Sequence, residues 1–192
     1  MVQDVRQRIV EAGYACVARR GMAKTTVEDV AREAGLSRAT VYRTFPGGRD
    51  ELIDATVAWA TFDFFAQLYE RIQGATSLEE MMERGIMFAY RSIVDHEVLQ
   101  RVMQTEPDKL LPALTVESIR IREGIAGVLS PYLVKRGLAE GVDLGDAADF
   151  LARMVLSYIS APGRWDLEDP GQVARLVRSE LLAGVVVPSG QP

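Results

Sequence analysis

The chain has 192 residues, which is enough for one or two domains that bury a core without metal ions or disulfides. Hydrophobic residues make up 48% of it and charged residues 26%, so disorder over the whole length is excluded. One cysteine and one histidine exclude an intramolecular disulfide, a multi-cysteine zinc site and any site built on a pair of histidines.

The net charge of -5 is unevenly distributed. Residues 1–52 carry a net +2 and the remainder a net -7. This asymmetry predicts two parts with different functions, of which only the first binds a polyanion. No apolar run approaches the roughly 20 residues of a membrane span, and the first residues lack the layout of a signal peptide. We therefore expect a cytoplasmic protein with no membrane partner.

Helical spacing recurs along the chain, and no stretch alternates apolar and polar residues as a strand would. The first helix is predicted to end at Gly21, with Cys16 as a core residue of its apolar face. Six later helices are predicted over residues 49–72, 78–95, 97–105, 114–135, 146–160 and 170–184. Pro107 and Pro112 are expected to bound a loop, and Asp169 is expected to cap the last helix.

Residues 25–45 read TTVEDVAREAGLSRATVYRTF and predict two further short helices. Thr25 and Thr26 are both possible N-caps of the first, and Thr25 and Glu28 fit a capping box. A glycine at 35 is suited to ending this helix, and Ser37 can cap the next. The three-residue turn between them is the layout of a helix-turn-helix.

The second helix of this pair carries side chains that suit the major groove. Arg38 and Arg43 can grip guanine with their forked donors, and the methyl group of Thr40 can touch that of thymine. Ser37 and Tyr42 have hydroxyls suited to phosphate, and Ala31, Ala34 and Ala39 are expected to let the two helices cross closely. The alternative is an ordinary helical hairpin in a core.

Residues 5–52 resemble the N-terminal domain of the TetR family of bacterial transcriptional regulators. The matching pieces are Ile9-Val10-x-Ala12, Gly21, Thr25-Thr26-Val27-x-Asp29-Val30-Ala31, Ala34-Gly35-Leu36-Ser37, Thr40-Val41-Tyr42 and Phe45-Pro46. The resemblance implies an all-α homodimer whose three N-terminal helices bind an operator half-site. It also implies a divergent C-terminal bundle that binds a small-molecule inducer, with repression as the common outcome and release from DNA on ligand binding.

This resemblance assigns roles to residues. It implies that Thr26, Ser37, Tyr42 and Thr44 contact the DNA backbone and that Arg38, Thr40 and Arg43 contact base edges. Arg49 takes the place of a phosphate-binding lysine that the family has after its Phe-Pro pair, one residue later here. We expect an all-α protein with a helix-turn-helix domain over 1–48, a ligand-binding and dimerisation domain over 49–184, and a tail over 185–192.

The C-terminal part offers candidates of two kinds, and bundle core is the alternative for both. An inducer pocket is predicted from Trp59, Phe62, Phe65, Met87, Tyr90, Met103, Glu123, Met154 and Tyr158. A four-helix dimer interface is predicted from Phe150, Leu151, Val155, Leu176, Val177 and Leu181.

Features of enzymes are missing from the sequence. There is no nucleophile–base pair and no glycine-rich phosphate loop, and His96 is expected at a solvated helix end rather than at a metal. We therefore expect no catalysis, no metal and no cofactor. The predicted function is a ligand-responsive transcriptional repressor that binds a pseudo-palindromic operator. The alternatives are an enzyme that uses scattered carboxylates and a ligand-sequestering bundle that keeps the hairpin only for packing.

Overall fold

The computed structural model describes residues 4–96, 100 and 107–187, and only the backbone of 107–118 and 120. Within these ranges the fold is all-α, as predicted, apart from turns and one isolated bridge between Leu138 and Val186. The residues form two compact units, 1–67 with 96–111 and 68–95 with 112–192. The predicted domain boundaries after residues 48 and 184 stay predictions. None of the helices described is long and apolar enough to cross a membrane.

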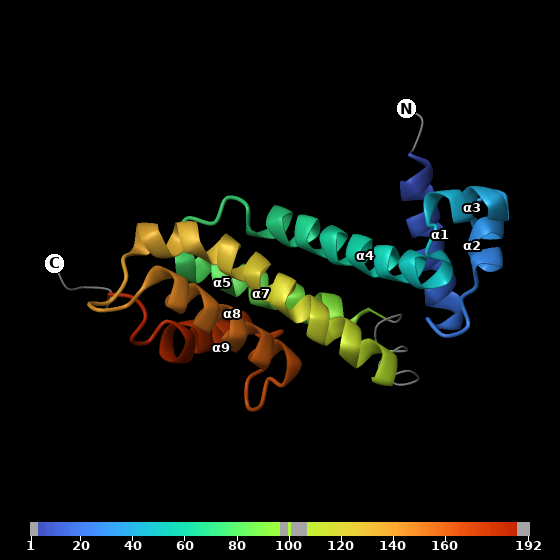
Figure 1. Cartoon of the computed structure of the whole chain (residues 1–192). Helices are drawn as coiled ribbons and strands as arrows, with labels where there is room; N and C mark the ends of the chain where they lie inside the picture. The colour runs from blue at the N-terminus through green and yellow to red at the C-terminus, as the bar shows by residue number, and fades with distance from the viewer. Residues whose placement is uncertain (1–3, 97–99, 101–106, 188–192) are drawn as a thin grey trace. The chain divides into compact units, whose positions relative to one another are not determined.

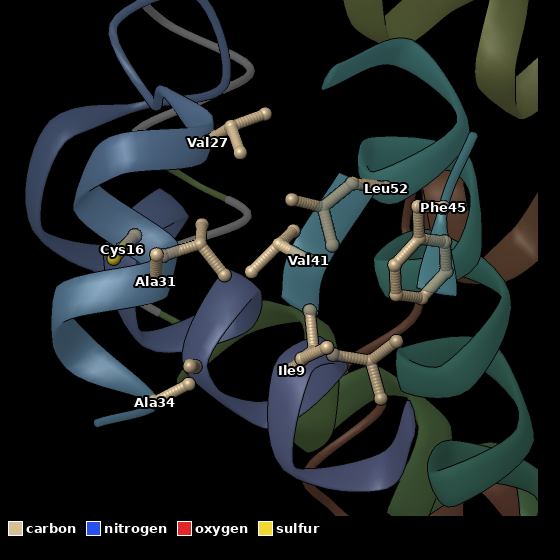
Figure 2. Packing of buried hydrophobic residues seen from close by; sticks show 11 residues of the cluster. Ile9, Cys16, Val27, Ala31, Ala34, Val41, Phe45 and Leu52 are labelled. Carbon is tan, nitrogen blue, oxygen red and sulfur yellow. The ribbon is translucent and has the colours of Figure 1, made fainter. Parts of the chain in front are cut away.

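The N-terminal unit contains α1 (Val5–Arg20), α2 (Val27–Glu33), α3 (Arg38–Thr44) and the first part of α4 (Gly48–Ile72). Figure 1 shows α1, α2 and α3 gathered beside the first turns of α4. Their shared core is fully buried at Ile9, Val30, Val41, Phe45 and Leu52. In Figure 2, Ile9, Val41 and Leu52 point toward one another from α1, α3 and α4. This core fixes how α2 and α3 meet.

The C-terminal unit contains the end of α4, α5 (Leu78–Val94), most of α7 (Pro107–Arg136), α8 (Leu144–Ser160), α9 (Pro170–Leu176) and a π-helical segment (Val177–Leu181). The helix α5 packs against α8, α9 and the π-helical segment. Ion pairs tie α7 to both neighbours, because Arg136 binds Glu79 of α5 and Arg122 binds Asp149 of α8.

Three predicted element limits in this unit need correction. The helix expected from residue 114 begins at Pro107, because proline is tolerated at the first helical position, and Pro112 removes one backbone hydrogen bond without ending the helix. Asp143 caps α8 two residues earlier than expected. The last helix changes to π-helical hydrogen bonding at Val177 and ends at Leu181. The helix predicted over 97–105 lies outside the described residues apart from residue 100.

Candidate nucleic-acid interface

The joint between α2 and α3 is built by the residues that end one helix and start the next. Gly35 adopts φ +62°, a conformation that side chains beyond glycine rarely accept. Its N–H donates to the carbonyl of Arg32 (3.2 Å), and the N–H of Leu36 donates to that of Ala31 (2.9 Å). These two bonds form a Schellman motif, which closes α2 and directs the chain into α3.

The N-terminus of α2 uses a different capping box from the predicted one. Thr26 is the N-cap, and its Oγ1 accepts from the N–H of Asp29 at 3.1 Å and donates to the Asp29 carboxylate at 2.8 Å. The hydroxyl of Thr25 is buried instead and donates to the carbonyl of Gly21 at 2.8 Å. The hydrogen bond from Thr26, together with the nearby charge of Arg20, holds the pKa of Asp29 below its ordinary value.

Ser37 caps α3 as predicted. Its Oγ accepts from the N–H of Thr40 at 3.1 Å and lies 2.9 Å from the Thr40 hydroxyl. Both hydroxyls therefore take part in closing the first turn of α3. The hydroxyl of Thr44 is also engaged, because it donates to the carbonyl of Thr40 at 2.9 Å.

One face of α3 points away from the core. Val41 is buried on the inner side, while Ala39 and Arg43 are exposed on the opposite side. Ala39 therefore does not lie between the two helices, as the sequence suggested, but beside Arg43 on the outer face. Arg43 has no ion-pair partner within the part of the chain that the structure describes. A small residue next to a free guanidinium lets the helix backbone approach a flat surface closely.

Arg38 and Tyr42 flank this face. The guanidinium of Arg38 forms an ion pair with the carboxylate of Glu28 on α2, and both side chains are about half exposed. Tyr42 is 44% exposed, and its ring lies over Gly48, where an added Cβ would be 3.4 Å from the ring. These two side chains are therefore held at the rim of the outer face rather than inside the protein.

Two other arginines stabilise the unit through contacts with residues that are distant in the sequence. Arg8 of α1 donates through Nε to the carbonyl of Ala34 at 3.1 Å, at the C-terminus of α2. Arg49 donates to the carbonyls of Thr25 (2.9 Å) and Met22 (2.5 Å) in the loop before α2. Arg49, predicted to bind phosphate, thus has its fork on protein carbonyls.

A surface hollow of about 430 Å³ lies in the C-terminal unit, and of the described residues predicted to form a pocket only Met87 lines it. Phe62 is 74% exposed, Glu123 is exposed, and Phe65, Tyr90 and Met154 are partly buried. The ring of Trp59 packs edge-on against Tyr14 in the N-terminal unit, and the hydroxyl of Tyr158 donates to Glu180. Met103 lies outside the described residues.

The residues predicted for the dimer interface are mostly interior. Leu151, Leu176, Val177 and Leu181 are 0% exposed and Val155 is 9% exposed, because α8, α9 and the π-helical segment pack on α5 within one chain. Phe150, at 43% exposed, is the member of the set that faces outward.

The histidine and the cysteine both belong to the N-terminal unit. His96 directly follows Asp95, the C-cap of α5, and is partly buried, and its Nε2 lies 2.8 Å from the hydroxyl of Tyr14. Burial, with the charge of Asp63, raises the pKa of Tyr14. Cys16 is 3% exposed, in the core as predicted, and burial raises the pKa of its thiol. Among the residues described, no group of three or more potential ligands could hold a metal ion.

Comparison with known proteins finds a family model and several relatives that this chain resembles. Residues 9–56 match the family model of bacterial regulatory proteins, tetR family. The chain is 23% identical over 186 residues to the HTH-type transcriptional repressor KstR2 of Mycobacterium tuberculosis (strain CDC 1551 / Oshkosh), covering 96% of this chain and 92% of that protein.

Solved structures agree over most of the chain. The TetR family repressor AlkX from Dietzia sp. strain DQ12-45-1b, implicated in biodegradation of n-alkanes, has 28% identity and a TM-score of 0.60, covering 90% of this chain and 92% of that one. The SmeT–triclosan complex has 22% identity and a TM-score of 0.58, covering 99% and 98%. Residues 9–56 therefore match the tetR family of bacterial regulatory proteins, and the chain as a whole is similar to an HTH-type transcriptional repressor and to a TetR family repressor of known structure.

Proposed function

We propose that this protein is a repressor that binds a pseudo-palindromic operator as a homodimer and leaves it when a small-molecule inducer binds. The observation that carries the DNA-binding part is the outer face of α3, where Arg43 lies beside Ala39 and has no ion-pair partner among the residues that the structure describes. The match to proteins named repressors, and the small molecule held by SmeT, support the remaining parts.

The outer face of α3 is the reading surface in this proposal. Arg43 makes a bidentate contact with guanine, and Ala39 allows the helix to sit deep in the major groove. Arg38 must exchange Glu28 for a base edge. An exposed ion pair of this kind contributes only about 0–1 kcal/mol to the free energy of unfolding, so breaking it costs little free energy. Thr40 offers its methyl group to thymine.

Groups at the edges of α2 and α3 contact the DNA backbone. Ser37 and Tyr42 lie beside the reading face, and Thr26 lies at the start of α2 next to the exposed Lys24. Thr44 and Arg49 are engaged within the protein, so we assign them positioning roles. Arg49 holds the loop that precedes α2 and thereby positions the start of the helix-turn-helix.

Dimerisation is assigned to the exposed side of α8. Phe150 is a large apolar side chain on that side, next to the exposed Arg153. Two copies related by a twofold axis would bury both phenylalanines at one isologous contact. A twofold dimer presents two α3 helices to successive major grooves, which is why the operator is expected to be an inverted repeat.

The release step requires a ligand that binds one of two conformations better than the other. The helix α4 belongs to both units, since residues 48–67 pack with the N-terminal core and 68–72 with α5. A ligand-driven shift of this helix would change the separation of the two α3 helices in the dimer.

Selection of bound fragments from the native genome tests the function directly. The protein should enrich an inverted repeat, and electrophoretic shift should yield a dimer complex on it. An Ala39→Glu variant should lose this complex, because it places a carboxylate on the reading face without touching the core. The matched control is Ala58→Glu, which changes another exposed alanine, on α4. Equal binding by both variants, or no enriched sequence, would contradict the proposal.

A further inference from the structure

The hollow of about 430 Å³ in the C-terminal unit is lined by arginines, although the unit as a whole is acidic. It lies between the last turn of α4 and one face of α5 and is lined by Arg71, Arg84 and Arg91 together with Met87, Phe88, Ser92 and Asp95. Residues 68–95 contain three Lys or Arg residues in all, and every one of them lines this hollow. The unit as a whole, residues 68–95 and 112–192, carries a net charge of -4.

The sequence of α5 creates this arrangement through helical spacing. Positions 84, 88, 91 and 95 follow one another by three or four residues, so they share one side of the helix. The other side is the buried core face of α5: Leu78, Met81, Met82, Ile86 and Ala89. The arginines therefore stand on the side of α5 that the bundle leaves open.

The arginines of the hollow differ in whether they already have hydrogen-bond or ion-pair partners within the protein. Arg84 pairs with Glu80 and donates to the carbonyl of Gln73 at 3.2 Å. The guanidinium of Arg71 lies 5.8 Å from the centre of the Phe88 ring. Within the described residues, neither Arg71 nor Arg91 has a carboxylate partner.

The lining combines these cations with an apolar surface. Met87 and Phe88 are partly buried, and Ser92 adds a hydroxyl donor. Among the described lining residues Asp95 is the one carboxylate, which gives these residues a net charge of +2. A volume of about 430 Å³ falls within the range of sites that take small organic molecules.

We propose that this hollow binds an organic anion, a carboxylate or phosphate monoester attached to a compact apolar body. Arg71 and Arg91 bind the anionic group with their forked donors, and Phe88 and Met87 cover the apolar body. Cationic molecules are repelled, although the unit is acidic overall. The proposal rests on the proposed function only where it makes this anion the inducer.

Direct titration tests anion binding at the hollow without reference to DNA. Calorimetry at 0.15 M salt with 2-naphthoate, 2-naphthyl phosphate and uncharged 2-naphthamide compares one apolar body with three head groups. Both anions, or one of them, should bind about tenfold more tightly than the amide. The preferred head group distinguishes a carboxylate site from a phosphate site. Equal binding of all three, or no binding of either anion, would overturn the proposal.

Variants locate the site. Arg71→Gln and Arg91→Gln should each weaken binding of the preferred anion about tenfold, and Arg91→Lys should lose less because it keeps the charge. The control is Arg175→Gln, which removes an exposed helical arginine of α9 in the same unit. Unchanged affinity in the Arg71 and Arg91 variants would show that the anion binds elsewhere and would overturn the proposal.

Operator release is measured in parallel. An anion that binds the hollow and releases the wild-type protein from its operator, but not the Arg91→Gln variant, supports both inferences. Binding without release supports the anion site and removes this ligand as the inducer. Release by another molecule with no anion bound at the hollow supports the proposed function and overturns the anion site.

Discussion

The arginines that frame α2 in the N-terminal unit and those that line the hollow of the C-terminal unit differ in whether the fold already gives them partners. In the N-terminal unit, Arg8 and Arg49 bind backbone carbonyls at the ends of α2, and Arg20 binds the carboxylate of Asp29. In the C-terminal unit, Arg71 and Arg91 face an open hollow and have no carboxylate partner among the described residues. Arg8, Arg20 and Arg49 are therefore building elements, as Arg122 and Arg136 are in the C-terminal unit, whereas Arg71 and Arg91 are available ligand groups.

This contrast shows that net charge is a poor guide to binding. The +2 of residues 1–52 overstates the cations available to DNA, because most of those arginines hold the helix-turn-helix together. Arg43 of α3 is an exception, with no ion-pair partner in the described part of the chain. The acidic C-terminal unit, in turn, contains a cationic hollow. What matters is which charges already have partners in the fold.

The largest expected effect comes from breaking each core separately. Leu52→Ala and Leu151→Ala remove equally buried leucines from the two units and should each cost about 2–5 kcal/mol in free energy of unfolding. Hydrogen exchange should accelerate in α1–α3 for the first and in α8 and α9 for the second. Equal acceleration in both units for either variant would contradict the division into two units.

The next largest effect is expected on the free energy of dimer association. Phe150→Glu places a carboxylate at the proposed twofold contact and should weaken association by about 2 kcal/mol or more. Analytical ultracentrifugation should then show a shift toward monomer. Val134→Glu, at an exposed apolar residue of α7, is the control and should leave association unchanged. The assignment of α8 would be wrong if both variants dimerised like the parent protein.

Arg49 distinguishes a structural arginine from a DNA-binding one. Arg49→Gln leaves the carbonyls of Met22 and Thr25 without their charged donor and should lower stability by about 1–3 kcal/mol. Arg49→Lys should be destabilised as well, because a lysine cannot bridge both carbonyls as the fork does. Thermal unfolding measures this. Unchanged stability with a reduced salt dependence of DNA binding would instead identify a phosphate contact.

The smallest expected effect concerns the cap of α2. Thr26→Ala should cost about 1 kcal/mol at pH 7. The lowered pKa of Asp29 means that its carboxylate stabilises the fold above the pKa it has when unfolded and loses this contribution as the pH falls through its folded value. The difference between parent and variant should therefore shrink in acid. A difference independent of pH would argue that Asp29 is not coupled to the cap.

Local chemistry made the helix ends of the N-terminal unit predictable. Gly35, Ser37 and Gly21 act at helix ends as the sequence indicated, because turns and caps depend on neighbouring residues. The capping box was predicted one residue too early, since Thr25 and Thr26 both have an acidic residue three positions later. Burial of Thr25 decides between them, and burial is not a local property.

Partners that are distant in sequence could not be predicted in the same way. Arg8 meets Ala34 across 26 residues, and no spacing signals it. Phe150 and Leu151 are adjacent apolar residues of α8, yet one is exposed and the other is core, because the direction of α9 and α5 decides which side is covered. Predicting which residues line a pocket or a dimer interface requires knowing how the helices pack, and spacing within one helix does not supply this.

The reading face of α3 is tested most directly by Arg43→Ala, titrated on the selected operator, on operators changed at single base pairs and on random duplex at one salt concentration. The variant should lose about 1–3 kcal/mol on the operator, become indifferent to one base position, and lose far less on random DNA. Equal losses on specific and random duplexes would show that Arg43 contributes charge alone and that α3 does not read the sequence through it.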